Sequence, residues 1–96
     1  MKNNKIPFLG KKSFKRRCGK CHICGEKEYK LLDVHRWRVE GKDGGKYSND
    51  NCLCVCVSCH RLIHANSIKI IGIFNSSCGK LLNYIDTNGK EKFNQI

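Results

Sequence analysis

The spacing of apolar residues changes along the chain, and each spacing predicts a different element. Residues 31–39 alternate between apolar and polar side chains and include β-branched and aromatic types, which predicts a strand. Residues 53–57 are a short apolar run that predicts a second strand. Residues 58–65 are expected to form a helix, with Ser58 as its N-cap and Asn66 as its C-terminal stop.

The end of the chain, residues 67–96, has a β-rich pattern without catalytic motifs. Asn88-Gly89 is a strong signal for a hairpin turn. Strands are expected at residues 68–74, 80–85 and 90–93. We expect this extension to cover one side of the preceding segment or to extend a small sheet.

Basic residues dominate the charge of the chain. It has 19 Lys and Arg against 8 Asp and Glu, a formal net charge of +11. Residues 1–17 are a polar basic arm broken at Pro7 and Gly10, and no acidic residue precedes Glu26. Such a concentrated excess favours DNA as a partner over a merely solvated surface, since phosphate contacts release counterions. We expect this arm to order on DNA. The expected phosphate contacts are Lys15, Arg16, Arg17 and Lys20.

Cysteine spacing predicts a structural metal site. Cys56 and Cys59 have the two-residue gap that lets both thiolates reach one tetrahedral zinc, and Cys21 with Cys24 supplies a matching knuckle. Cys18 and Cys21 have the same gap, so Cys18 competes with Cys24. We favour Cys24 because the glycine directly after it allows a tight turn. Zinc would supplement the small core of a 96-residue domain.

Two other interpretations of the cysteines are less favoured. A disulfide framework needs a secreted protein, and the N-terminus has no apolar run of signal-peptide length. A thiol redox protein would not spread its cysteines over two distant pairs with metal spacing. Cys52 and Cys54 are expected in the core, and Cys78 in a turn. No segment approaches the roughly 20 apolar residues of a membrane span, so we expect an intracellular protein.

Two histidines predict a second metal site. His60 and His64 are four residues apart, so a helix places both imidazoles on one face. A site with nitrogen ligands from one helix leaves room for water. The alternative is that these two, together with His35 on the first strand, are ordinary half-exposed histidines.

Taken jointly, these residues resemble an HNH endonuclease. Asn51 lies nine residues before His60, and His64 lies four after it, spacings that the family shares. The remaining similar features are Val34-His35, a glycine-rich loop at residues 41–45 that should be flexible, and the two Cys-x-x-Cys pairs, Cys21 with Cys24 and Cys56 with Cys59. The resemblance covers about residues 21–65. It implies a zinc-stapled ββα-metal (His-Me finger) domain at residues 18–66. Together with the basic arm before this domain and the β-hairpin expected in the C-terminal extension, the expected fold is α+β.

The resemblance also implies roles for individual residues. Hydrolysis of a phosphodiester needs a cation that neutralises charge on the phosphoryl oxygens and a base that deprotonates the attacking water. By similarity, His60 and His64 bind this cation, expected to be Mg²⁺, with Mn²⁺, Ni²⁺ or Zn²⁺ as alternatives. His35 faces them from the strand, and Asn51 braces the loop and orients His35.

The role of His35 depends on register. Family members often carry an acidic residue or His followed by His here, the first binding metal and the second acting as base. If His35 is the first, Arg36 stands at the base position, and an arginine cannot accept a proton. If His35 is the base, Val34 cannot bind metal, and Asp33 on the same strand face assists. Arg36 is expected to clamp a phosphate, and Arg38 is a further expected DNA contact.

The sequence thus predicts a metal-dependent DNA endonuclease. The alternative is a catalytically silent zinc-containing DNA-binding module, which Arg36 favours, whereas the joint presence of three histidines favours the enzyme. The sequence sets neither the target site nor the oligomeric state nor the product; a homodimer would allow double-strand cleavage, a monomer a nick. Small free-standing proteins similar to this one are often encoded by phages and mobile elements, so we expect it in the cytoplasm of a host cell.

Overall fold

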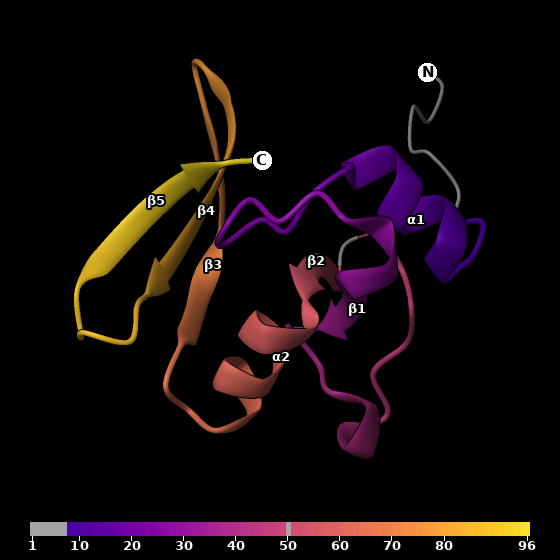
Figure 1. Ribbon diagram of the computed structural model, residues 1–96, viewed down its shortest axis with the longest axis horizontal. Coiled ribbons are helices and arrows are strands. Elements are labelled where there is room, and N and C mark those ends of the chain that lie inside the picture. The colour runs from indigo at the N-terminus through magenta and orange to yellow at the C-terminus, as the bar shows by residue number, and fades with distance from the viewer. Residues whose placement is uncertain (1–7, 50) are drawn as a thin grey trace.

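Two antiparallel sheets lie on either side of a short central helix in the computed structural model, which describes residues 8–49 and 51–96 (Figure 1). Helix α1 lies at one end of the molecule and the larger sheet at the other. In chain order the elements are α1 (Lys11–Cys18), η1 (Tyr29–Leu31), β1 (Leu32–Arg36), η2 (Gly41–Asp43), β2 (Cys52–Cys56), α2 (Val57–His64), β3 (Lys69–Ser76), β4 (Gly79–Ile85) and β5 (Glu91–Gln95).

The smaller sheet pairs β1 with β2, which correspond to the strands expected at residues 31–39 and 53–57. The strands are antiparallel, with Leu32 opposite Cys56 and His35 opposite Leu53. Every residue of β2 is buried, because α1 and α2 both pack against this two-stranded sheet. Since side chains alternate along a strand, Asp33 and His35 share the face of β1 that meets α2.

Helix α2 follows β2 without a loop, and its first residue corrects one prediction. The N-cap is Cys56, whose sulfur accepts a hydrogen bond from the backbone N–H of Cys59 at 3.4 Å. Ser58 therefore lies inside the first turn and does not cap it. At the other end, Asn66 has a φ of 62° and stops the helix as predicted.

Helix α1 is a second correction, because the basic arm was expected to order on DNA. Its residue Phe14 is only 5% exposed and joins the core, which anchors the helix against β1 and β2. Lys15 Nζ donates a hydrogen bond to the Leu32 carbonyl at 3.1 Å. The helix ends at Gly19, whose φ of 76° closes the last turn. Residues 1–7, including Pro7, lie outside the described residues.

The larger sheet has the order β3-β4-β5, so the C-terminal extension is a three-stranded sheet, not the hairpin alone. Its β4–β5 turn contains Asn88-Gly89 as predicted, with Gly89 at a φ of 78°. Asn94 on β5 donates hydrogen bonds to the carbonyl oxygens of His22 and Ile23, at 3.0 and 2.9 Å. The larger sheet therefore contacts the backbone between Cys21 and Cys24 and does not extend the β1–β2 sheet. No helix of the described residues is long and apolar enough to cross a membrane.

Candidate metal centres

The predicted structural site is assembled. The sulfurs of Cys21, Cys24, Cys56 and Cys59 all lie within 4.8 Å of one another, and those of Cys24 and Cys56 are 3.6 Å apart. Zinc–sulfur bonds of about 2.3 Å at a tetrahedral angle put two sulfurs about 3.8 Å apart. The four thiols therefore fit one zinc ion. Cys18 is not a member of the group, which confirms the choice of Cys24.

Local backbone geometry shapes the first half of this site. The backbone N–H groups of Ile23 and Cys24 both point at the sulfur of Cys21, at 3.4 Å. Gly25 has a φ of 85° and donates its N–H to the Cys21 carbonyl at 3.0 Å. A residue with a Cβ would be strained in this left-handed conformation, so the glycine after the second cysteine permits the tight turn, as the sequence predicts.

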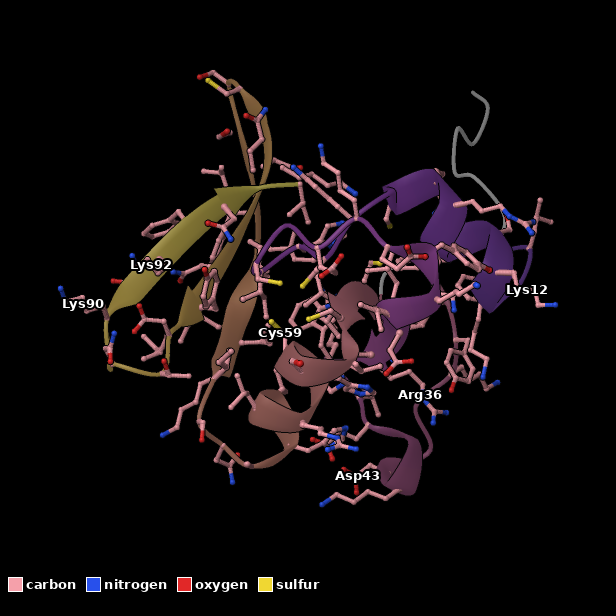
Figure 2. All side chains as sticks on the ribbon, viewed as in Figure 1. Lys12, Arg36, Asp43, Cys59, Lys90 and Lys92 are labelled. Atoms are coloured by element: carbon pink, nitrogen blue, oxygen red, sulfur yellow. The ribbon has the colours of Figure 1, made fainter. Side chains whose placement is uncertain are left out.

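The second half of the site comes from the β2–α2 junction. Cys56 is the last residue of β2, and Cys59 lies in the first turn of α2, both almost fully buried. Figure 2 shows Cys59 near the centre of the molecule with sulfur atoms close by. A zinc ion bound here would tie the knuckle at Cys21 to the start of α2, which are far apart in sequence.

The four thiols need a bound cation before all of them can ionise together. Burial raises the pKa of Cys59, and the negative charge of Cys21 raises it further. Burial also raises the pKa of Cys24. At Cys21, burial acts in the same direction, but the backbone N–H donors outweigh it and lower the pKa. Four thiolates at such short range repel one another, so all four ionise together only when a metal ion compensates their charge.

Three histidines form a second cluster. Nitrogen atoms of His35, His60 and His64 lie within 4.8 Å of one another, and the Nε2 atoms of His60 and His64 are 3.1 Å apart. His35 comes from β1, and its ring lies edge-on to both helical rings, with centroid distances of 5.0 and 5.3 Å. Nitrogen ligands on one cation at about 2.1 Å are separated by about 3.4 Å at a tetrahedral angle. The cluster could therefore hold one ion.

Asp33 determines which nitrogen of His60 faces the cluster. Its Oδ2 lies 3.1 Å from His60 Nδ1. A proton on Nδ1 is stabilised by this carboxylate, which leaves the Nε2 lone pair directed at His64. The sequence placed Asp33 on the same strand face as His35, but the structure pairs it with His60.

His35 is held in its neutral form. The side chain is 5% exposed, and burial together with the charges of His60 and His64 lowers its pKa to about 4. A neutral imidazole keeps a lone pair that can bind a cation near neutral pH. The buried position of His35 thus prepares it for metal binding.

An open cavity of about 400 Å³ adjoins the histidine cluster. Its lining includes the three histidines together with Arg36, Glu40 and Lys42. Glu40 and Lys42 belong to the loop around η2, and no spacing rule in the sequence marks either of them as a site residue. The cavity leaves space beside the imidazoles for a ligand and water.

Arg36 lies at the edge of this cavity, where it supports the loop. Its Nη1 donates a hydrogen bond to the Gly45 carbonyl at 3.2 Å, and its guanidinium lies over the Tyr47 ring at 4.2 Å. The guanidinium also fills the space beside Gly41, where any Cβ would collide with it. Figure 2 shows Arg36 close to the η2 loop that carries Asp43. Arg38, in contrast, lies over the ring of Trp37.

Asn51 holds both ends of the loop. Its Oδ1 accepts hydrogen bonds from the N–H groups of Arg38 and Val39, at 2.9 and 2.7 Å. Its Nδ2 donates to the carbonyl oxygens of Val39 and Lys46, at 2.8 and 2.9 Å. The side chain thus supplies the loop contacts that the resemblance implies. The glycine-rich segment, expected to be flexible, is a 3₁₀ turn held at its base.

We expect Asn51→Ala to lower the free energy of unfolding by about 3 kcal/mol, because it leaves buried backbone groups without partners. Urea denaturation measures this loss. The matched control is Asn75→Ala on β3, where the side chain is exposed and the expected change is within about 0.5 kcal/mol. Equal losses for the two variants would mean that other contacts hold the loop.

The predicted DNA-contact residues of the arm divide into two groups. Lys15 and Arg17 take part in the fold, since Lys15 bonds to β1 and Arg17 Nη2 donates to Asn49 Oδ1 at 2.7 Å. Arg16 and Lys20 are exposed, as is Lys12, which points outward from α1 in Figure 2. Arg17 is exposed as well, and the Arg16 guanidinium lies over the Tyr29 ring, 5.6 Å from its centroid.

The remaining cysteines lie where the sequence predicts. Cys52 and Cys54 are 3% and 0% exposed and belong to the core. Cys78 is exposed in the turn between β3 and β4.

Comparisons of the chain with protein-family models, curated proteins and solved structures found no match.

Proposed function

We propose that this protein is a metal-dependent DNA endonuclease of the HNH type. The observation that carries the proposal is the convergence of three imidazoles from β1 and α2 beside an open cavity. A second set of four thiols joins the knuckle at Cys21 and Cys24 to the junction of β2 with α2. A zinc-binding module that only contacts DNA needs the thiols, but it has no use for three converging imidazoles.

The histidine cluster fits a divalent cation. His35, His60 and His64 would hold it, and imidazole ligands favour Ni²⁺ or Zn²⁺ over the Mg²⁺ and Mn²⁺ that also stand as candidates. A cation there supplies charge neutralisation for the phosphoryl oxygens and the leaving oxygen. The chain itself contributes rigidity: Asp33 orients His60, burial keeps His35 neutral, and Asn51 braces the loop at the cavity edge.

The distances favour one of the two registers for His35. Its nitrogen lies in the same group as those of His60 and His64, which is the arrangement of a third ligand. We therefore assign His35 to the metal and Arg36 to the position that family members use for the base. Arg36 bonds to Gly45 and lies over Tyr47, so its role is to position the loop and to attract phosphate.

A nicking assay on supercoiled plasmid tests the proposal. The protein is purified with its zinc retained and incubated with magnesium, manganese, nickel or EDTA. We expect relaxed circles with at least one of these metals and none with EDTA. If no metal produces a nick above the background of His60→Ala, the endonuclease proposal is wrong.

The alternative function is a zinc-containing DNA-binding module without catalytic activity. The observation that favours it is Arg36, which stands where a base is expected and cannot accept a proton. This module would bind DNA but would not cleave it with any of the metals tested. The plasmid assay therefore separates the two functions.

The exposed basic residues of α1 are proposed to contact the DNA backbone. We expect the double variant Lys12→Gln and Arg16→Gln to weaken DNA binding and to reduce the salt slope by about 0.9 for each phosphate contact removed. Fluorescence anisotropy across a series of salt concentrations measures this slope. Glutamine keeps the helix propensity, so α1 and its buried Phe14 stay intact.

The control for this variant is Lys90→Gln. Lys90 is also exposed, but Figure 2 shows it beside β5, at the opposite end of the molecule from Lys12. We expect its salt slope to match that of the wild type. If the double variant also keeps the wild-type slope, α1 does not face the DNA.

A further inference from the structure

The proposed endonuclease needs a base, and this inference rests on that proposed function. His35, His60 and His64 are assigned to the cation, so none of them is free to take a proton from water. Arg36 is protonated under all ordinary conditions. Asp33 is engaged with His60 Nδ1 at 3.1 Å. The proton acceptor must come from another side chain that reaches the same cavity.

Glu40 is the carboxylate among the described residues that line this cavity. The cavity also contains Lys42, which is a donor only, and Tyr47, whose hydroxyl is a poor base at neutral pH. Glu40 shares the wall of this cavity with all three histidines of the cluster.

The backbone around Glu40 is fixed, whereas its carboxylate is accessible. The Glu40 carbonyl accepts hydrogen bonds from the N–H groups of Asp43 and Gly45, at 3.0 and 2.8 Å. Val39, which precedes Glu40, is held by hydrogen bonds between its backbone and the Asn51 side chain. Among the described residues, the carboxylate forms an ion pair with Lys42 Nζ at 3.7 Å, and the Glu40 and Lys42 side chains are 48% and 78% exposed. Such an exposed ion pair is weak, so the carboxylate stays free to move.

We infer that Glu40 is the general base of the proposed reaction. A water molecule in the cavity attacks the phosphorus, and its proton moves to the Glu40 carboxylate as the new P–O bond forms. The bond from phosphorus to the 3′ oxygen breaks, its electron pair stays on that oxygen, and the oxygen takes a proton from solvent. In this assignment a loop carboxylate supplies the function that Arg36 cannot.

The test compares Glu40→Gln with wild type. Glutamine keeps the size and the hydrogen-bonding capacity of the side chain but cannot take the proton. We expect the single-turnover cleavage rate at neutral pH to fall by about 10²-fold to 10⁴-fold. We expect Ni²⁺ affinity by calorimetry and DNA affinity by anisotropy to stay within about twofold of wild type. Glu40→Asp should recover part of the rate.

The dependence on pH gives a second readout. With the base removed, hydroxide from solvent becomes the nucleophile, so the rate of Glu40→Gln should rise about tenfold for each pH unit between 7 and 9. The wild-type rate should change much less over that range. Asp43→Asn is the matched control, because Asp43 is exposed on the same loop but does not line the cavity. It should cleave like wild type.

The possible failures are distinguishable. If Glu40→Gln cleaves like Asp43→Asn, the base assignment is wrong and the endonuclease function stands. If Glu40→Gln loses Ni²⁺ affinity together with activity, Glu40 is a metal ligand and the base assignment is again overturned. If the wild type cleaves under no metal condition, the proposed function fails and this inference fails with it.

Discussion

Replacing Cys56 with serine is expected to unfold the protein, the largest effect on stability that we predict. Cys56 contributes one of four sulfurs to the thiol cluster, and its sulfur also caps α2. Structural zinc of this kind contributes on the order of 10 kcal/mol to folding, which is comparable to the total stability of a small domain. Serine cannot replace a thiolate as a zinc ligand.

Circular dichroism and zinc analysis of the purified protein measure this outcome. We expect Cys56→Ser to lose its zinc and its cooperative thermal transition. Cys78→Ser is the matched control, since Cys78 is exposed in the β3–β4 turn and outside the cluster. It should keep both zinc and the transition. A zinc-free Cys56→Ser protein that still melts cooperatively would contradict the structural role of the site.

The largest effect on activity is expected for His60→Ala. His60 lies at the centre of the histidine cluster, between Asp33 at its Nδ1 and His64 at its Nε2. Loss of an outer-shell partner alone typically costs 10-fold to 100-fold, so loss of the ligand should reduce plasmid nicking by more than about 100-fold. Binding of DNA should remain nearly unchanged, because phosphate contacts elsewhere supply it.

Two companion variants sharpen this prediction. Ser58→Ala is the control on α2, since Ser58 is exposed and does not cap the helix; it should nick at the wild-type rate. His35→Ala should behave like His60→Ala and also lower Ni²⁺ affinity in calorimetry, because we assign His35 as a ligand. Unchanged Ni²⁺ affinity with lost cleavage would instead make His35 the base, and Glu40 would lose that role.

Local spacing explains why the two clusters of candidate metal ligands were predictable. Two cysteines separated by two residues bring their sulfurs together through one turn of backbone, whatever surrounds them. His60 and His64 share a helix face because of the helical period alone. Strand β1 was predictable because residues 31–39 alternate between apolar and polar side chains, and β2 because residues 53–57 are a short apolar run. The ends of both strands differ from the prediction by a few residues.

The two errors have different causes. The segment Lys11–Cys18 is strongly basic, and it forms a helix because Phe14 packs in the core against residues far away in sequence. Ser58 is a good N-cap by residue type, but α2 begins directly after β2, so the sulfur of Cys56 caps the helix through a contact three residues along the chain.

The sequence by itself determined the two sets of metal-binding residues and the order of strand, strand and helix that carries them, because spacing along one chain controls these features. Tertiary structure alone decided which groups surround the histidines. It brought Asp33 to His60, Arg36 to the loop and Glu40 to the cavity wall. Asp33, Arg36 and Glu40 reach these positions through the geometry of the loop and the pairing of β1 with β2. Neither the loop geometry nor the strand pairing produces a periodic pattern in the sequence, so the sequence alone did not predict these contacts.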